Sequence, residues 1–545
     1  MENNSHMRTG MEVDGQSYST LMVDKDCLGH VFTFFPLVEL GTTISRVSKE
    51  WRHIVESTMP KVNLPFPPFN FQSHQSAHQY NMRLLRALTS RLGRRHVSEV
   101  QFPFWSDTFQ AEPTASQIIR NRLYECITNA SNLQRLVLGN DFVKDETEEI
   151  HWKPFCEAVA SNNSITSLDV SWNFIDDSKD LANLILMTSN LLELVLHDCN
   201  ISLNSLESIC ASLVENQSIR SLDISSLCEA ILGNERAQNL FAHLLLHNHT
   251  LVELKISQLD ITPFGIDAIT SALCENRSIR TIDLSHNEFG EEGAIALATA
   301  IQINHSITDL RISNIGLGPI GVRAIANSLH QHKGLTALDI SLNVFGSEGS
   351  KAFAKVLSIN NSIRHLNLEG CLYSSNEVKT FLSGLVANRS ISTLTLANNR
   401  IDANHLQSVL STLYQHVDVG HTNASLTSLD LGNNPLLDTG AHMLATALRT
   451  NSTVTQLNLA NCEITSFGLK EIVQAVEKNG SLTSLNIASN KIGDKDAIEL
   501  SAMLRKNRHL THLDLSGCKF TRIGIEAILN SLTHNRALSL AHSVE

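Results

Sequence analysis

Three histidines stand close together near the middle of the chain, at His243, His247 and His249. Residues four apart lie on the same face of a helix, so His243 and His247 could together bind a zinc ion. A zinc site needs further protein ligands, and no matching cysteine or acidic residue is recognisable nearby. Because the chain has 24 histidines, we interpret the spacing as coincidence and expect no metal and no cofactor.

Short motifs that mark common catalytic and nucleotide-binding sites are missing from the sequence. There is no GxxxxGK[ST] phosphate-binding loop, no HExxH motif and no GxSxG nucleophile turn. Carboxylate pairs are frequent, but nothing in their pattern distinguishes a catalytic acid from a solvated one. We therefore expect a protein that is not an enzyme, and the missing phosphate loop disfavours a nucleotide-driven receptor.

Most of the chain repeats one unit, which is clearest at residues 278–307, reading SIRTIDLSHNEFGEEGAIALATAIQINHSI. The first half has the apolar pattern of a short strand, and the second half, from Gly290, has helical spacing. Such a unit cannot bury both apolar faces alone, so it needs copies of itself on each side. The first apolar residue of each copy is found at Leu133, Ile165, Leu191, Ile219, Leu251, Ile279, Ile307, Leu335, Ile363, Ile391, Leu426, Val454, Leu482 and Leu510.

The spacing of these copies is regular, because nine of the thirteen successive intervals are 28 residues long. A degenerate copy at Val97–Phe102 precedes them, and a truncated copy at Leu538 and Leu540 follows. Parallel strands stack about 4.8 Å apart, whereas helices need about 10 Å each. The stack must therefore bend into an α/β horseshoe solenoid over residues 97–545, with parallel strands inside and helices outside. The copies resemble leucine-rich repeats of the long subclass typified by ribonuclease inhibitor.

Composition limits the partners and the compartment of the protein. A net charge of −13 disfavours nucleic acid as a ligand, because the phosphate backbone is itself negative. The ten cysteines include no CxxC pair, and Cys199, Cys371, Cys462 and Cys518 stand where sister repeats have asparagine, which predicts buried turns. With no signal-peptide pattern and no apolar run near twenty residues, we expect no membrane contact and a reducing, cytoplasmic location. A nuclear location, or the host cytosol for a secreted bacterial protein, stays open.

The N-terminal part of the chain does not follow the repeat. Residues 1–20 are polar and without periodicity, which predicts a disordered tail. Residues 21–58 carry three short apolar stripes at helical spacing and so predict a small all-α domain. Its core is too small to keep the domain stable alone, which suggests that something else covers its remaining apolar surface. Residues 59–96 are expected to be a linker rich in Pro and Asn, followed by a cap of the solenoid.

The segment 21–58 resembles an F-box. The family pattern is matched by Asp26-Cys27-Leu28, by VFTFFP from Val31, by Glu39-Leu40 and by VSKEWR from Val47, while Val23-Asp24 stand where the family has Leu-Pro. The resemblance implies docking to a Skp-family adaptor and, through it, to a cullin scaffold. The residues that it assigns to the adaptor contact are Cys27, Leu28, Val31, Phe32, Pro36, Leu40, Val47 and Trp51. The alternative is a helical cap that only shields the first repeat.

Residues beside each strand leucine are expected to face the concave surface, because side chains alternate along a strand. Most of them are acidic, among them Asp169, Asp223, Asp430 and Asp514, and only Arg135, Lys255 and Arg311 oppose them. This pattern predicts an acidic trough for a basic partner; the alternative is a stock strand sequence with polar residues facing water. The candidate partner-binding residues are Trp172, Glu193, His197, Glu253, Lys255, Asp283, Asp309, Arg311, Asp339, His365 and Glu369.

Two longer repeats and one aromatic residue depart from the regular pattern. Residues 228–232 add length between a strand and a helix, and residues 415–424 (QHVDVGHTNA) add about seven after a helix. Such insertions are either binding loops or tolerated drift. Trp172 stands where sister repeats have His286, Leu342, Asn398 or Ser489, which predicts an exposed tryptophan at the end of a strand. It would be a binding hot spot or pack on the adjacent turn.

These features favour the target-binding subunit of a cullin-type ubiquitin ligase, with an unknown protein as its target. The alternative is a scaffold or interaction protein whose N-terminal helices are only a cap. A regulator of a small GTPase of the Ran type shares the repeat length, but such proteins carry an acidic tail. This chain ends in His-Ser-Val-Glu at Glu545, so we rank that alternative low.

Overall fold

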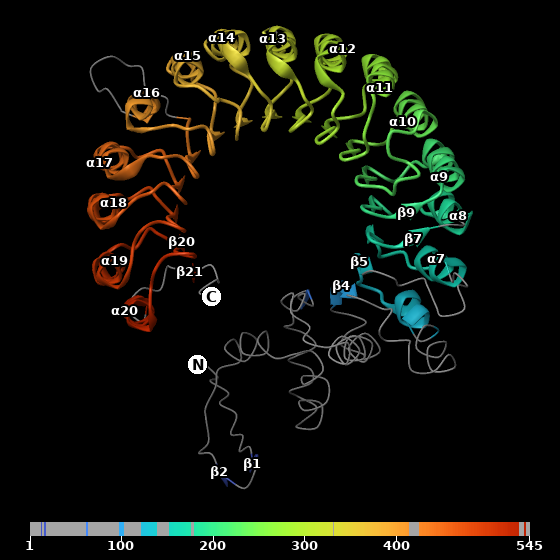
Figure 1. Ribbon diagram of the computed structural model, residues 1–545. Helices are drawn as coiled ribbons and strands as arrows, with labels where there is room; N and C mark the ends of the chain where they lie inside the picture. Colours follow the sequence, from blue (N-terminus) through green and yellow to red (C-terminus); the bar gives the residue numbers. More distant parts are fainter. Residues whose placement is uncertain are drawn as a thin grey trace, which may run out of the picture. The chain divides into compact units, whose positions relative to one another are not determined.

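The computed structural model describes residues 12–13, 16–17, 62–63, 97–102, 121, 123–138, 152–175, 179–330, 332–413, 425–532 and 539–540. The chain divides into two compact units, residues 1–231 (unit 1) and residues 232–545 (unit 2). In each unit, short parallel strands form one layer and helices form the other (Figure 1). This arrangement confirms the expected α/β solenoid with strands on one side of the stack and helices on the other.

Unit 1 has a parallel sheet whose strands follow the order of the chain. Its strands are β3 (Val62–Asn63), β4 (Val97–Phe102), β5 (Arg135–Leu138), β6 (Ser167–Asp169), β8 (Glu193–Val195) and β10 (Ser221–Asp223). The helices are α7 (Trp152–Ala160), α8 (Lys179–Met187) and α9 (Leu203–Glu215), with a further helical stretch over 123–129. The sheet begins one strand before the copy at Val97. This first strand, β3, pairs with β4 and lies in the segment expected to be linker and cap.

Unit 1 also contains two pairs of short strands that are not part of this sheet. β7 (Phe174–Ile175) pairs in parallel with β9 (Asn200–Ile201), just beyond the turns that follow β6 and β8. β1 (Glu12–Val13) pairs antiparallel with β2 (Gln16–Ser17), within the segment expected to be a disordered tail.

Unit 2 continues the same pattern with one strand and one helix in each repeat. Its parallel strands are β11 (Glu253–Lys255), β12 (Thr281–Asp283), β13 (Asp309–Arg311), β14 (Ala337–Asp339), β15 (His365–Asn367), β16 (Thr393–Thr395), β17 (Ser428–Asp430), β18 (Gln456–Asn458), β19 (Ser484–Asn486), β20 (His512–Asp514) and β21 (Ser539–Leu540). Its helices are α10 (Glu235–His247), α11 (Pro263–Glu275), α12 (Gly290–Ile303), α13 (Gly318–Leu329), α14 (Gly346–Leu357), α15 (Ser375–Leu385), α16 (Ala403–Leu413), α17 (Leu437–Leu448), α18 (Ser466–Lys478), α19 (Asp494–Lys506) and α20 (Arg522–Leu532). The strands of this unit line its concave side and the helices its convex side (Figure 1).

The core lies between the two layers and is made by the repeated apolar positions. Every anchor residue named above, from Leu133 to Leu510, is no more than 2% exposed. The central residue of each strand is buried too, as Leu310 at 0% shows, and so is one face of each helix. Because each strand is only a few residues long, burial of these positions fixes the register of the sheet.

A ladder of buried asparagines joins the C-terminal ends of successive helices. In the repeat of α12, Asn304 Nδ2 donates to the carbonyl oxygens of Leu273 and Asn276, at 2.7 and 2.9 Å. Its Oδ1 accepts the N–H groups of Ser306 and Ile307. The side chain thus satisfies carbonyls that a helix end leaves free and turns the chain toward the next strand. The same position holds Asn216, Asn248, Asn276, Asn360, Asn388, Asn451, Asn479 and Asn507.

His332 replaces asparagine in this ladder and makes it sensitive to pH. Its Nδ1 accepts the N–H of Leu335 at 3.0 Å, so Nε2 carries the proton and donates to the carbonyl of Asn304 at 2.9 Å. Burial lowers the pKa of His332, and the nearby His305 lowers it further, whereas the bond to Asn304 raises it. A proton on Nδ1 would face the Leu335 N–H, so the neutral ring is the form that fits.

We expect the stability of unit 2 to fall as the pH drops below about 6.5, the ordinary pKa of histidine. In that range the unfolded chain binds a proton at His332 that the folded ring resists. The free energy of unfolding therefore falls by at most about 1.4 kcal/mol for each pH unit. His332→Asn should flatten this part of the curve. Urea unfolding of both proteins from pH 7.5 to 5.0 measures it, and equal slopes would contradict the assignment.

A second ladder of asparagines lies in the turns that follow the strands. Asn343 Nδ2 donates to three carbonyl groups, one of them in the preceding repeat. Its Oδ1 accepts the N–H groups of Ile315 and Leu317, both in the preceding repeat, at 3.1 and 3.2 Å. The asparagine of one repeat therefore completes the turn of the repeat before it. Asn287, Asn399, Asn434 and Asn490 do the same.

Candidate protein-interaction surface

The concave side of unit 2 presents two rows of side chains that take no part in the core. In each strand the central residue is buried and its two neighbours face the open side. The parallel register aligns these neighbours across the strands. One row comprises Glu253, Thr281, Asp309, Ala337, His365 and Thr393, and the other comprises Lys255, Asp283, Arg311, Asp339, Asn367 and Thr395. We call these rows, from β11 to β16, the strand face.

Charges on the strand face are partly paired with one another. Arg311 Nη2 lies 3.0 Å from Asp309 Oδ2, and Lys255 Nζ lies 3.6 Å from Glu253 Oε1. The hydrogen bond that Arg311 donates to Asp309 raises the pKa of Arg311, and Asp283 and Glu253 add to this effect. The face is therefore acidic, but its two cations neutralise part of the trough that the sequence predicted.

A shallow depression of about 300 Å³ lies on the strand face between β13 and β16. Its carboxylates are held by hydrogen bonds, since Asp339 accepts from Asn367 Nδ2 at 2.9 Å and from the hydroxyl of Ser341 at 2.6 Å. The residues that line it include the candidates Asp309, Arg311, Asp339 and His365, together with Ala337, Leu338, Leu366, Asn367, Thr393 and Thr395. Glu369 follows β15 by two residues and is half-buried, but it does not line the depression.

In unit 1, the corresponding strand residues form one bridged cluster. Arg135 lies 3.5 Å from Glu99 and 3.6 Å from Glu193, and the hydroxyl of Ser167 donates to the same Glu193 carboxylate. The structure thus pairs each basic residue of the predicted trough with an acidic neighbour. The pairs of Arg135 with Glu99 and Glu193 were missed by sequence reasoning because they join residues that become neighbours only in the sheet.

Trp172 is exposed at the end of its strand, as predicted, with 54% of its surface accessible. Its indole lies edge-on to His197, with ring centroids 5.8 Å apart, and the backbone N–H of Trp172 donates to the His197 carbonyl. The backbone at Trp172 is left-handed, with φ of 69°. The same turn position is left-handed in the other repeats, where asparagine, the residue that tolerates this region best after glycine, is frequent (Asn314, Asn398, Asn433, Asn461).

We expect Trp172→Asn to leave the stability of unit 1 within about 1 kcal/mol of the parent. The lost edge contact with His197, worth about 0.5–1.5 kcal/mol, is offset by relief of left-handed strain of about 1–2 kcal/mol. Urea unfolding followed by far-ultraviolet circular dichroism measures the change. A loss above about 2 kcal/mol would show that Trp172 serves packing.

Several predicted features fall outside the described residues. These are all the residues assigned to the adaptor contact, Cys27, Leu28, Val31, Phe32, Pro36, Leu40, Val47 and Trp51, and the insertion at residues 415–424. The insertion at residues 228–232 lies between β10 and α10, as expected.

The cysteines that replace asparagine are hydrogen-bond donors in the turns. Cys199, Cys371 and Cys462 are buried, and each Sγ donates to a carbonyl of the preceding repeat at 3.2 or 3.3 Å. Burial raises the pKa of each of these thiols to about 12. Cys518 is only half-buried, contrary to expectation, since its turn follows β20 near the C-terminal end of the stack.

We expect these three thiols to resist alkylation in the native protein. With a pKa of about 12, only about one thiol in ten thousand is ionised at pH 8, and the thiolate is the reactive form. Mass spectrometry after iodoacetamide treatment at pH 8 should find Cys199, Cys371 and Cys462 unmodified until denaturant is added. The half-buried Cys274 is the internal comparison, and equal labelling of all four would contradict the burial.

One hydrogen-bonded chain in unit 2 has the order of a serine nucleophile site. Ser375 Oγ lies 2.7 Å from His405 Nε2, and His405 Nδ1 lies 2.7 Å from Asp402 Oδ1. The same two positions, again thirty residues apart, hold Ser466 and Asp496, which are joined at 3.0 Å. Asp496 also caps the N-terminus of α19. We therefore assign these hydrogen bonds of Ser375, His405 and Asp402 to capping between successive helices rather than to catalysis.

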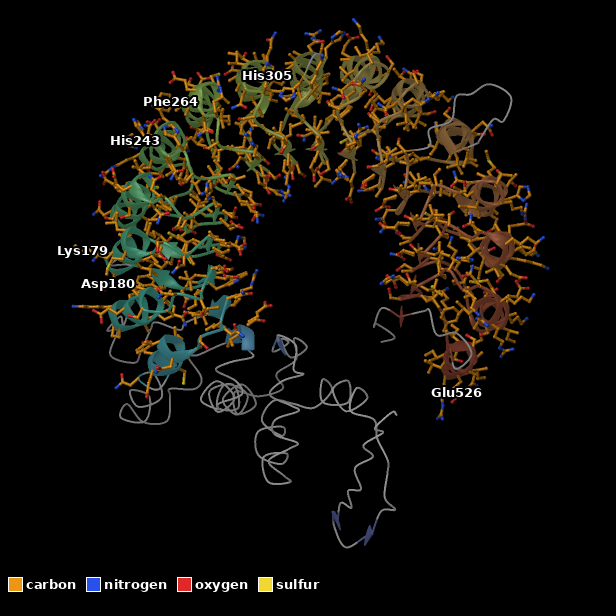
Figure 2. All side chains as sticks on the ribbon, turned by 180° about the vertical axis from the view of Figure 1, so that it is seen from behind. Lys179, Asp180, His243, Phe264, His305 and Glu526 are labelled. Atoms are coloured by element: carbon orange, nitrogen blue, oxygen red, sulfur yellow. The ribbon has the colours of Figure 1, made fainter. Side chains whose placement is uncertain are left out.

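The histidines considered as zinc ligands lie on the convex side of unit 2. His243 and His247 stack on α10 with ring centroids 4.1 Å apart, and His243 is on the outer side of the helix layer (Figure 2). Within the part of the chain that the structure describes, no group of three or more His, Cys, Asp and Glu could hold a metal ion. Among the described helices, none is long and apolar enough to cross a membrane.

Comparison with known proteins agrees with the fold. The family model described as "Leucine Rich repeat" matches residues 161–178, 275–298, 333–354, 422–445, 450–473, 478–501 and 506–529. Together with the stacked strand–helix units, these matches make the fold a leucine-rich-repeat solenoid, and such repeats are protein-interaction scaffolds.

Curated relatives match only part of the chain. Ribonuclease inhibitor from Mus musculus is 29% identical over 138 residues, which are 25% of this chain and 30% of that protein. Leucine-rich repeat-containing protein 34 from Mus musculus is 30% identical over 95 residues, which are 17% of this chain and 22% of that protein. The chain therefore spans less than a third of the length of either relative.

Solved structures show more distant likenesses. A crystal structure of the Rad7 and Elc1 complex in yeast aligns at 14% identity, covering 79% of this chain and 96% of that chain, with a TM-score of 0.47. Leiomodin-1 Actin-Binding Site 2 aligns at 23% identity, covering 29% of this chain and 88% of that chain, with a TM-score of 0.25. At these TM-scores neither likeness bears on function, which must be argued from this chain's own residues.

Proposed function

We propose that this protein is the target-binding subunit of a cullin-type ubiquitin ligase in the cytoplasm. Residues 21–58, whose sequence resembles an F-box, dock a Skp-family adaptor and through it a cullin scaffold. The strand faces of the repeats hold a protein target. The protein itself makes and breaks no bond; it supplies proximity between the target and the conjugating machinery.

The observation that carries target binding is Trp172. A tryptophan that is 54% exposed, in a left-handed turn where other repeats have asparagine, contributes little to packing. Large aromatics in such places are frequent hot spots of protein interfaces. The half-buried, hydrogen-bonded carboxylates of the strand faces support the same function, because they are polar groups that the core does not use.

Co-purification of the full chain with adaptor and cullin tests the adaptor half of the proposal. The wild type should retain both, and a Pro36→Ala, Trp51→Asp double variant should lose both while keeping its circular dichroism spectrum. Trp172→Asn is the matched control, because it should retain the adaptor. Adaptor capture that survives the double variant would overturn the assignment of residues 21–58.

Proximity labelling in cells tests the target half. Proteins labelled by the full chain but lost in Trp172→Asn are target candidates. Those that also become more abundant when residues 1–60 are deleted are candidates for ligase substrates. A folded protein that labels targets but captures no adaptor would instead be a scaffold, the alternative that the sequence left open.

A further inference from the structure

A group of exposed apolar side chains lies in the same repeats of unit 2 as the strand-face depression. Leu342, Val344 and Tyr373 lie in the turns that follow β14 and β15, and they are 42%, 51% and 47% exposed. We call these three residues the apolar rim. Strands β14 and β15 also line the depression, so both features belong to one continuous part of unit 2.

Leu342 resembles Trp172 in its backbone and its exposure. Its φ is 57°, at the turn position where most other repeats have asparagine, glycine or another polar residue. Leucine is strained in this region by about 1–2 kcal/mol, and the fold gains little from a side chain that is 42% exposed. Gly370 makes room for it, since a methyl group there would lie 2.9 Å from Leu342 Cδ2. Leu342 and the glycine at the same position of the next repeat thus together hold an apolar side chain at the surface.

The net charge of the strand face determines the sign of the charge that a partner should carry. Its four carboxylates (Glu253, Asp283, Asp309 and Asp339) stand against Lys255 and Arg311, a net charge of −2, and Glu369 adds a further negative charge two residues beyond β15. Asp339 is oriented by Asn367 and Ser341 rather than by a cation. A carboxylate fixed by neutral donors keeps its charge for an incoming cation and needs little rearrangement to bind it.

We propose that this part of unit 2 binds an extended segment of a protein target that presents one arginine or lysine to Asp339 and a neighbouring apolar residue to the apolar rim. The depression, at about 300 Å³, is at the lower limit of ligand pockets and suits a single long side chain. A cation beside Asp339 completes the row Lys255, Asp283, Arg311, Asp339, in which charges of opposite sign already alternate. The inference rests on the proposed function only in taking the target to be a protein.

Selection of a random twelve-residue peptide display library on the full-length protein tests this inference. Enriched peptides should carry arginine or lysine beside an apolar residue, and their affinity should fall as salt is raised. Synthetic versions of those peptides, followed by fluorescence anisotropy, should bind about tenfold or more weakly to Asp339→Asn and to Leu342→Asn. Leu342→Asn installs the residue of sister repeats, so it should fold at least as well as the parent.

Asp430→Asn is the matched control, because it makes the same change on β17, outside the depression. It should leave peptide affinity unchanged. The inference is overturned if the library yields no binder, if the binders lack a basic residue, or if Asp339→Asn binds them as tightly as the parent. Adaptor co-purification is unaffected by these variants, so failure here and failure of the ligase proposal are distinguishable.

Discussion

Replacing Asn343 with alanine should lower the free energy of unfolding of unit 2 by about 2–6 kcal/mol. The substitution removes the acceptor of two buried N–H groups, those of Ile315 and Leu317, and each unpaired buried donor costs about 1–3 kcal/mol. Urea unfolding gives the total. Hydrogen exchange gives the location, because the amide protons of Ile315 and Leu317 should exchange faster than those of more distant repeats.

Asn361→Ala is the matched control for this prediction. Asn361 is exposed in the same unit, and its substitution should change stability by less than about 0.5 kcal/mol. A cost below about 1 kcal/mol for Asn343→Ala would contradict the role that we give to the turn ladder.

Gly384→Ala should destabilise unit 2 by about 3 kcal/mol. Gly384 lies on α15 where this helix meets α14, and a methyl group there would lie 2.1 Å from the carbonyl oxygen of Ala354 and 2.5 Å from its Cα. Backbone atoms cannot rotate out of the way as a side chain can, so the two helices must separate. Thermal unfolding by circular dichroism measures the loss.

Gly480→Ala is the comparison for this second prediction. Gly480 is exposed, and a methyl group there would approach only His509, at 3.8 Å. Its stability should change by less than about 1 kcal/mol. If both variants were equally stable, α15 would not depend on its close approach to α14.

Much of the fold could be predicted because the constant repeat length determines which residues align in neighbouring strands. Once Ile279 and Ile307 are recognised as the same position, burial of one requires burial of the other, and the strands must align. The same comparison predicted that Trp172 is exposed, because a turn that holds His286 or Asn398 in other repeats leaves no room for it in the core.

The interactions between repeats could not be read in the same way. The ion pair of Arg135 with Glu193 crosses an intervening strand, and the depression depends on Ala337 and Thr393 becoming neighbours of His365. These are properties of the assembled sheet. Leu342 was noticed only as a variant of the Trp172 position, although a left-handed backbone makes a leucine there costly.

The adaptor contact stays a prediction from sequence. It rests on the resemblance of residues 21–58 to an F-box, and these residues lie outside the part that the structure describes. The domain boundaries at 20, 58 and 96 likewise stay predictions.

The turn ladder implies that the repeats of unit 2 are not interchangeable under deletion. Asparagine alternates with another residue from Asn287 through Ile315, Asn343 and Cys371 to Asn399. Removing the repeat of Ile315 would place two asparagines in succession, as already occurs at Asn399 and Asn434, where Asn434 accepts the N–H of Asn399. Removing the repeat of Asn343 would bring Ile315 against Cys371 and leave two amide protons without an acceptor. Deletion of the repeat of Ile315 is therefore tolerated, whereas deletion of the repeat of Asn343, which has the same length, is not.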